Sequence, residues 1–321
     1  MAARKKTSVG VIGLGSMGMG VARTLVARGF DAHGFDVRAE SLRAFARAGG
    51  TAHKTPASLA AACDVVIILV VNADQTSAVL FGKEGAAPAL RKGSVVIASA
   101  TVAPEFAIDL GERLAARGLL MIDAPVSGGA ARAAKGELSI MASGDKAAFR
   151  KADTVLKAIS AKVYRLGDTP GMGSKVKMIN QLLAGVHIAS ACEAIALGIR
   201  AGADPNVLYE VISNSAGSSW MFQNRVPHIL KGDYTPLSAV SIFVKDLGIV
   251  LDSAKKMTFP LPLTAAAHQL YLAAAGAGLS GEDDSAVIKV YQQQSGIALP
   301  AGKAGARKTA ARRRKAPVRK R

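Results

Sequence analysis

Residues 9–36 read VGVIGLGSMGMGVARTLVARGFDAHGFD, an apolar run that breaks into closely spaced glycines and then resumes with helical spacing. This order predicts a buried strand, a tight turn and a helix. Gly13, Gly15 and Gly18 have the G-x-G-x-x-G spacing, in which the first permits the turn, the second lets backbone approach a pyrophosphate and the third lets helix pack on strand. Glycines also mark ordinary turns, but the strand before this motif and the helix after it favour a dinucleotide site. The motif's predicted cofactor-binding residues are Gly13, Leu14, Gly15, Ser16, Met17 and Gly18.

Asp36 ends the second strand pattern, at 32–36, and bears on which dinucleotide is bound. Its carboxylate would accept hydrogen bonds from the adenosine ribose and repel a 2′-phosphate, which favours NAD. Arg38 is the counter-signal, because a guanidinium two residues later could pair with that phosphate. The sequence therefore favours NAD and leaves NADP as the alternative.

Further strands and helices alternate along the first half of the chain. Strand patterns cover residues 63–71, 94–98 and 119–123, and helical patterns cover residues 17–28, 41–48 and 55–62. Two shorter strand patterns, at 138–143 and 163–166, would extend the same sheet. This alternation predicts an α/β fold with a doubly wound Rossmann sheet, whose ligands bind at the carboxyl ends of the strands.

The sequence pattern changes at Gly171. Helical patterns dominate from there to about residue 299, beginning with a long helix at about 174–200, and no comparable strand pattern follows. We therefore predict four parts: a flexible basic N-terminus (1–7), an NAD-binding Rossmann domain (8–170), an all-helical domain for substrate binding and oligomerisation (171–300), and a disordered basic tail (301–321).

The net charge of +18 is concentrated at the ends of the chain. Ten lysines and arginines follow Pro300 with no acid among them, and Arg4, Lys5 and Lys6 add three, so residues 7–300 carry +5. The tail, which mixes these cations with Ala, Gly and Pro, is typical of a solvated appendage. It predicts weak, sequence-independent affinity for polyanions.

The rest of the composition indicates a soluble, cytoplasmic protein. The longest unbroken apolar run, 65–71, is too short to span a bilayer, and the N-terminus has no apolar segment of the kind that forms a secretory signal. Cys63 and Cys192 have neither a disulfide framework nor metal-binding spacing, and no metal is predicted. The long apolar helices of the second domain suggest a homo-oligomer, a dimer or a tetramer.

Four separated motifs resemble the β-hydroxyacid dehydrogenase family, which includes 3-hydroxyisobutyrate dehydrogenase and tartronate semialdehyde reductase. They are VGVIGLGSMG at 9–18, DAPVSGG at 123–129, GMGSKVKMINQ at 171–181 and KDLG at 245–248. Residues 218–236, SSWMFQNRVPHILKGDYTP, look most like its L-threonate dehydrogenase branch.

The resemblance implies an assignment for the catalytic and substrate-binding residues. The family's catalytic lysine corresponds to Lys177, and the loop that holds the substrate carboxylate corresponds to Ser127, Gly128 and Gly129. This chain departs from the family four residues after the lysine, where Gln181 replaces the usual asparagine. The residue that orients the substrate hydroxyl is therefore either Gln181 or its neighbour Asn180.

The resemblance also implies cofactor contacts outside the glycine-rich turn. Thr101 would approach the nicotinamide, and Lys245 of the K-D-L motif would close over the cofactor from the helical domain. Where the family usually has M-L-P, this chain has Leu69, Val70 and Val71, which makes Val71 and the nearby Gln75 candidate contacts.

General chemistry supports a lysine in this role. Oxidation of an alcohol by NAD needs a group that takes the hydroxyl proton, and a lysine can do so when desolvation lowers its pKa. Lys177 and Lys175 are two residues apart on a predicted helix and so point to nearly opposite sides. Most lysines are solvated, so without the motif Lys177 would be read as a surface residue.

These observations predict an oxidoreductase that transfers hydride between a short hydroxy acid and NAD, with L-threonate the favoured substrate. The alternatives within the family are reduction of tartronate semialdehyde and oxidation of 3-hydroxyisobutyrate. A different class of function is a non-catalytic dinucleotide-binding protein whose basic tail docks on nucleic acid, and Lys177 argues against it.

Overall fold

The computed structural model describes residues 7–300, and the chain divides into two compact units, Met1–Asn180 and Gln181–Arg321. The division falls inside α8 (Met172–Arg200), so the start of this long helix belongs to the first unit. The basic tail and the first six residues lie outside the described residues.

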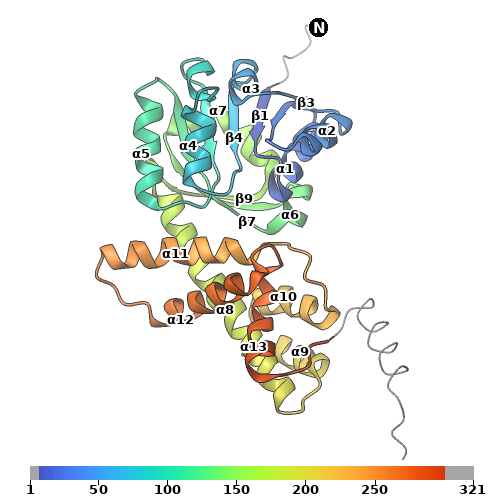
Figure 1. Ribbon diagram of the computed structural model, residues 1–321. Helices are drawn as coiled ribbons and strands as arrows, with labels where there is room; N and C mark the ends of the chain where they lie inside the picture. Colours follow the sequence, from blue (N-terminus) through green and yellow to red (C-terminus); the bar gives the residue numbers. More distant parts are fainter. Residues whose placement is uncertain (1–6, 301–321) are drawn as a thin grey trace, which may run out of the picture. The chain divides into compact units, whose positions relative to one another are not determined.

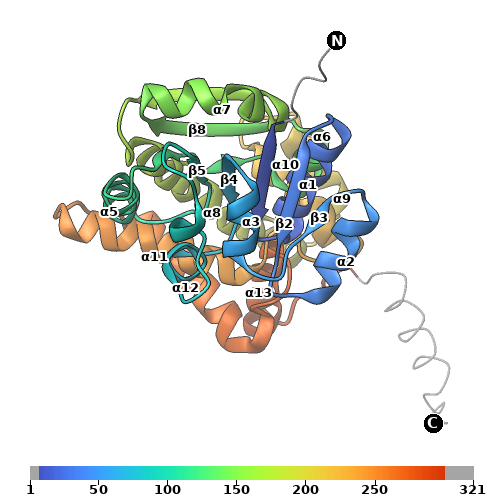
Figure 2. The ribbon, with the colours of Figure 1, turned by 90° about the horizontal axis from the view of Figure 1, so that it is seen from above.

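A single nine-stranded sheet forms the centre of the first unit (Figure 2). Its path runs β3-β2-β1-β4-β5-β6-β8-β7, with β9 paired to β8. The strands from β1 to β6 are parallel, whereas β8 is antiparallel to β6 and β7. The strands are β1 (Ser8–Ile12), β2 (Asp31–Phe35), β3 (Thr51–Ala52), β4 (Val65–Ile68), β5 (Val95–Ala98), β6 (Leu120–Asp123), β7 (Val126–Ser127), β8 (Leu138–Gly144) and β9 (Ser160–Gly167).

Helices cover both faces of this sheet, which confirms the predicted doubly wound fold (Figure 1). The first face, which packs around Val11, Leu25 and Phe45, is covered by α1 (Ser16–Ala27), α2 (Ala39–Arg47), α6 (Gly129–Lys135) and α7 (Lys146–Ile159). The second face, around Leu59 and Leu110, is covered by α3 (Pro56–Ala62), α4 (Ala73–Phe81), α5 (Pro104–Ala115) and the short η1 (Ala87–Ala89).

The strand predicted over residues 63–71 is shorter in the structure. Cys63 caps α3, and β4 ends at Ile68. The Leu69 N–H still bonds to the Ile12 carbonyl at 2.8 Å, after which the chain leaves the sheet and Asn72 caps α4. The apolar residues 69–71 thus form the loop at the carboxyl end of the strand, where their hydrophobicity alone could not separate them from it.

The second unit is helical throughout its described part, with one isolated bridge between Ala239 and Asp283. Ile188, Cys192 and Ile195 of α8 are fully buried in its core. The other helices are α9 (Pro205–Ser213), α10 (Trp220–Lys231), α11 (Val240–Lys256), α12 (Pro262–Ala274), the π-helical segment η2 (Ala275–Leu279), η3 (Asp284–Val287) and α13 (Ile288–Ser295).

Within residues 7–300, α8 is the one helix long and apolar enough, by length and composition, to cross a membrane. Lys175, Lys177 and Glu193 interrupt its sequence, so α8 contains no long unbroken apolar run. The buried apolar residues of its second half, from Ile188 to Ala196, belong to the core of the second unit, and the core helix of a soluble protein passes the same test of length and composition.

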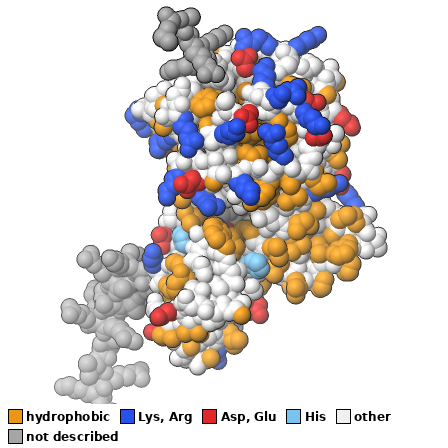
Figure 3. All heavy atoms as spheres, turned by 180° about the vertical axis from the view of Figure 1, so that it is seen from behind, with side chains coloured by type: hydrophobic (Ala, Val, Ile, Leu, Met, Phe, Trp, Pro, Cys, Tyr) orange, Lys and Arg blue, Asp and Glu red, His pale blue; other side chains and the backbone are white. Residues whose placement is uncertain are grey.

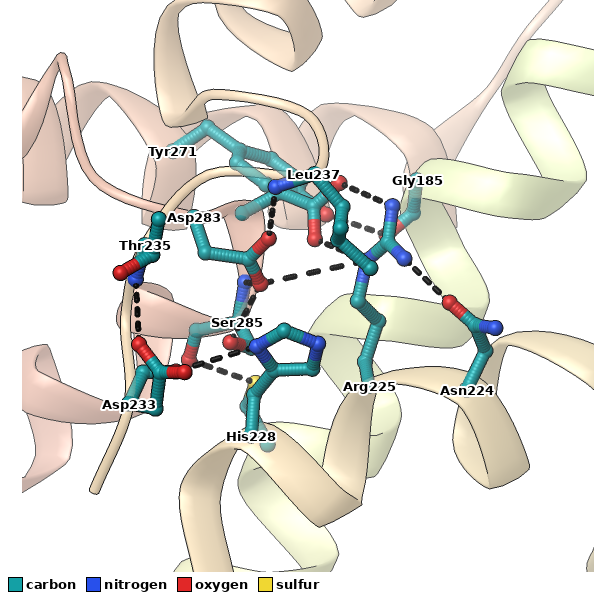
Figure 4. A network of polar contacts seen from close by, with 12 residues as sticks. Gly185, Asn224, Arg225, His228, Asp233, Thr235, Leu237, Tyr271, Asp283 and Ser285 are labelled. Atoms are coloured by element: carbon teal, nitrogen blue, oxygen red, sulfur yellow. Dashed lines mark hydrogen bonds and ion pairs between the residues drawn. The ribbon is translucent and has the colours of Figure 1, made fainter. Parts of the chain in front are cut away.

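A buried polar network ties the helices of the second unit together (Figure 4). Arg225 on α10 donates from Nε and Nη2 to the two oxygens of Asp284, at 2.5 and 3.1 Å. Asp283 is also fully buried, with an oxygen 4.0 Å from Arg225 Nε. The Tyr271 hydroxyl donates to the Gly185 carbonyl on α8 at 3.0 Å. Burial raises the pKa of Asp284 to about 6, although the Arg225 charge opposes the rise.

Candidate active site

The glycine-rich turn has the shape that a pyrophosphate site needs. Gly13 has φ +95°, and a Cβ there would lie 2.6 Å from the Leu69 carbonyl oxygen. A Cβ on Gly18 would lie 1.8 Å from the Gly13 oxygen, so only glycine lets α1 start this close to the strand. Within residues 7–300, and apart from its chain neighbours, a Cβ on Gly15 would have one atom within 4 Å, Arg38 Nη2 at 3.9 Å. The space beside Gly15 is therefore open, which is compatible with the close approach of a pyrophosphate that the motif predicts.

Asp36 lies directly behind this turn. One carboxylate oxygen accepts the Leu14 N–H at 2.7 Å, and the other accepts the backbone N–H and Nε of Arg38 at 2.8 and 3.1 Å. Burial raises the pKa of Asp36, but the hydrogen bonds from Arg38 and Leu14 outweigh it and hold the pKa below its usual range. Asp36 thus helps to shape the turn, and it is paired with Arg38, the residue that the sequence identified as the counter-signal to NAD.

The other predicted cofactor contacts lie at the ends of β4 and β5. Gln75 accepts the Val71 N–H through its side-chain oxygen at 2.9 Å, so the two predicted contacts brace each other. Val71 is about half exposed, and Thr101 lies three residues beyond β5. These residues surround the carboxyl edge of the parallel strands, where ligands bind in this fold.

The predicted carboxylate-binding loop follows β7. Ser127 ends that strand and pairs with Ser139 on β8. Gly128 and Gly129 have φ of +130° and +72°, values that disfavour any residue with a side chain. Gly128 is half-buried and Gly129, the first residue of α6, is exposed, so part of this turn is accessible to a ligand.

Asp123 fastens the start of α8 to this part of the sheet. The carboxylate accepts the N–H groups of Gly171 and Ser174 at 2.9 and 2.8 Å and the Ser174 hydroxyl at 2.7 Å. Burial raises the pKa of Asp123, and the bonds from Ser174 and Gly171 offset part of the rise. The contacts fix the direction of α8 and so the position of Lys177, which lies in the second turn of this helix.

Lys177 is buried, with 7% of its surface exposed, whereas Lys175 on the other side of α8 is exposed. The predicted opposition of the two lysines is therefore present in the structure. Gln181, one turn after Lys177 on the same face, is 8% exposed, and the intervening Asn180 is partly exposed.

Gln181 is held by a residue that the sequence did not single out. Its Nε2 donates to Asp246 Oδ2 at 2.6 Å, and Lys245 Nζ contacts Asp246 Oδ1 at 2.5 Å. Because a carboxylate only accepts hydrogen bonds, this contact directs the nitrogen of the Gln181 amide toward Asp246 and its oxygen away. The K-D pair on α11 thus positions both the predicted substrate contact Gln181 and the predicted cofactor contact Lys245.

Sequence reasoning missed the roles of Asp123 and Asp246, although each carries a readable signal. Asp123 is an acid at the carboxyl end of a parallel strand. Asp246 shares a helical stripe with Phe243, Leu247 and Val250, all of them buried. An acid inside a buried stripe is unusual unless it has partners.

The chain is similar to known dehydrogenases over most of its length. Residues 8–167 match the family described as the NAD-binding domain of 6-phosphogluconate dehydrogenase. Residues 171–291 match the family described as NAD-binding of NADP-dependent 3-hydroxyisobutyrate dehydrogenase. L-threonate dehydrogenase of Cupriavidus necator is 64% identical over 92% of this chain and 99% of its own length. That of Escherichia coli K12 is 50% identical over 92% and 97%. A crystal structure of 3-hydroxyisobutyrate dehydrogenase from Salmonella typhimurium has a TM-score of 0.85 at 49% identity, covering 89% of this chain and 100% of the other.

The Rossmann sheet, its glycine-rich turn and these matches define an NAD-binding oxidoreductase. More narrowly, the chain belongs to the β-hydroxyacid dehydrogenase family of 3-hydroxyisobutyrate dehydrogenase-like enzymes. The family that the four sequence motifs indicated is confirmed, as is the class of hydroxy acid dehydrogenase.

Proposed function

We propose that this protein oxidises L-threonate to its 2-oxo acid with NAD. The observation that carries the proposal is the buried Lys177, held on a helix that Asp123 fastens to the sheet, in a chain 64% identical to a protein named L-threonate dehydrogenase. Three further relatives named L-threonate dehydrogenase are 49–50% identical to this chain over 92% of its length.

Each residue has a separate task in this proposal. Ser127 and the N–H groups of Gly128 and Gly129 bind the substrate carboxylate. Lys177 takes the proton from the hydroxyl group that is oxidised. Bound NAD supplies the hydride acceptor. Gln181, its amide oriented by Asp246, accepts a hydrogen bond from a substrate hydroxyl or from the Lys177 ammonium.

NAD is proposed over NADP because the Asp36 carboxylate lies behind the glycine-rich turn and would repel a 2′-phosphate. Thr101, Val71, Gln75 and Lys245 are proposed as further cofactor contacts. A cytoplasmic location is proposed from the sequence alone.

We also propose that the chain forms a homo-oligomer. Hydrophobic side chains gather on the second unit in Figure 3. Met257 and Phe259, in the connection between α11 and α12, and Leu263, at the start of α12, are 61–73% exposed. Exposed apolar surface of this kind favours association of protein surfaces. Light scattering of the purified protein measures the mass directly.

Absorbance of NADH tests the reaction. For the oxidations, purified protein is incubated with NAD or NADP and either L-threonate or 3-hydroxyisobutyrate. For the reduction, it is incubated with NADH and tartronate semialdehyde. We expect the highest kcat/KM for L-threonate with NAD. A higher value for either other substrate would replace the proposed substrate and retain the family chemistry.

A further inference from the structure

The proposed carboxylate-binding loop is built from neutral groups, and one cation lies against it. Arg132 follows the loop by one turn on α6, and its side chain folds back across Gly128. A Cβ on Gly128 would lie 2.8 Å from Arg132 Cδ and 3.0 Å from Arg132 Cβ. The stem of the arginine therefore occupies the place that a side chain at residue 128 would take.

The guanidinium of Arg132 has neither a hydrogen bond nor an ion pair within residues 7–300. Several other arginines of the chain do have an acidic partner: Arg38 pairs with Asp36, Arg91 with Asp64 and Arg225 with Asp284. Arg132 is exposed, so its charge is available to a ligand.

The backbone that carries Arg132 is firmly placed. The Thr24 hydroxyl on α1 donates to the Ala133 carbonyl at 3.1 Å, with the Ala134 carbonyl at 3.2 Å. A Cβ on Gly20 of α1 would lie 2.8 Å from the Ala134 nitrogen, so the two helices are in close contact. The arginine is therefore held beside the loop by α1, the helix of the glycine-rich turn.

We propose that Arg132 binds the substrate carboxylate and so selects acids over neutral polyols. The inference rests on the proposed role of the loop at residues 127–129. A hydroxyl and two N–H groups can donate to a carboxylate but do not balance its charge. A guanidinium does both, with two parallel N–H donors that match the two oxygens.

The test compares Arg132→Ala and Arg132→Lys with Lys135→Ala, which removes another cation of the same short helix. The substrates are L-threonate and L-threonamide, whose neutral amide replaces the carboxylate. Kd for NADH is measured by fluorescence. We expect Arg132→Ala to raise KM for L-threonate roughly 10- to 100-fold, with a smaller change in kcat, because hydrogen bonds to charged groups are among the stronger ones.

Turnover of L-threonamide should change little, so the preference for the acid should shrink in Arg132→Ala and return in part in Arg132→Lys. Lys135→Ala should behave as wild type. An unchanged acid-to-amide preference in Arg132→Ala would overturn the proposal. Weaker NADH binding with that preference unchanged would also overturn it, and would assign Arg132 to the cofactor.

A further control separates the role of Arg132 from the identity of the substrate. All three candidate substrates carry a carboxylate, so the same comparison is made with whichever of them the wild type turns over fastest and with its amide. Failure of L-threonate in the wild type would overturn the proposed function alone. Failure of the acid-to-amide shift with an active substrate would overturn the role of Arg132 alone.

Discussion

Lys177 differs from an ordinary surface lysine because its helix face is covered. Its neighbour Lys175 is exposed, and Gln181 on the Lys177 side is fixed by the Asp246 carboxylate. Burying an ammonium is unfavourable unless partners or chemistry require it. The two lysines of one helical turn therefore make a natural pair for testing the proton-accepting role.

Lys177→Ala should lower turnover by roughly two to four orders of magnitude, since that is the usual contribution of a general base. NAD binding should be unchanged, because the glycine-rich turn lies on other residues. Steady-state kinetics and NADH fluorescence measure the two effects. Lys175→Ala is the matched control and should keep wild-type turnover. Turnover within a few-fold of wild type in Lys177→Ala would show that another group takes the proton.

Asp36 has two tasks at once, and substitutions separate them. Asp36→Ala should raise the NADP-to-NAD ratio of kcat/KM by roughly fivefold or more, because two like charges about 4 Å apart in water repel by about 1 kcal/mol. Arg38 remains in this variant to pair with the 2′-phosphate. Asp36→Asn should shift the ratio similarly and keep an acceptor for the Leu14 N–H, so it should cost less affinity for both cofactors. A wild type that already prefers NADP would contradict the role given to Asp36.

At the scale of helices, the buried network of α10, α12 and η3 makes stability depend on pH. The folded-state pKa of Asp284, about 6, lies above its usual value of 3.8 because of burial. The folded protein therefore holds this proton more tightly than the unfolded chain. The protonated Asp284 carboxyl therefore adds to the free energy of unfolding. This contribution is complete below pH 3.8 and is lost as pH rises through about 6.

Asp284→Asn should remove this dependence. The quantity compared is the free energy of unfolding of wild type minus that of the variant. As pH rises from 3.8 through about 6, this difference should fall by at most about 3 kcal/mol, because each pKa unit corresponds to 1.36 kcal/mol. Denaturant titrations between the two pKa values measure the difference. Asp252→Asn, at an exposed acid of α11, is the control. A constant difference between wild type and Asp284→Asn would contradict the raised pKa.

The elements differ in how far local sequence could predict them. The opposition of Lys175 and Lys177 followed from helical periodicity, and the glycine-rich turn followed from its spacing. The antiparallel direction of β8 did not follow, because strand direction is set by the connections and packing rather than by an apolar run. Asp246 was overlooked for a similar reason: adjacent Lys and Asp are typical of a solvated helix, and only the packing of α8 against α11 buries the acid.

Across the whole molecule, the positive charge is concentrated at the two ends of the sequence. Residues 7–300 carry +5 of the net +18, and ten of the remaining cations follow Pro300. The tail lies outside the described residues, so its function is predicted from composition alone. Ten cations among Ala, Gly and Pro, without an aromatic residue, cannot bury a core of their own.

Truncation after Pro300 should therefore leave kcat, KM, melting temperature and oligomeric mass nearly unchanged. It should abolish retention on heparin or DNA at low salt, because the tail binds phosphates or sulfates by releasing their condensed counterions. A full-length variant with the ten tail cations changed to Gln is the matched control and should lose retention equally. Its elution from heparin would then show that charge, and not chain length, binds the polyanion. A truncated protein that lost activity or failed to assemble would show instead that the tail contributes to a site or an interface.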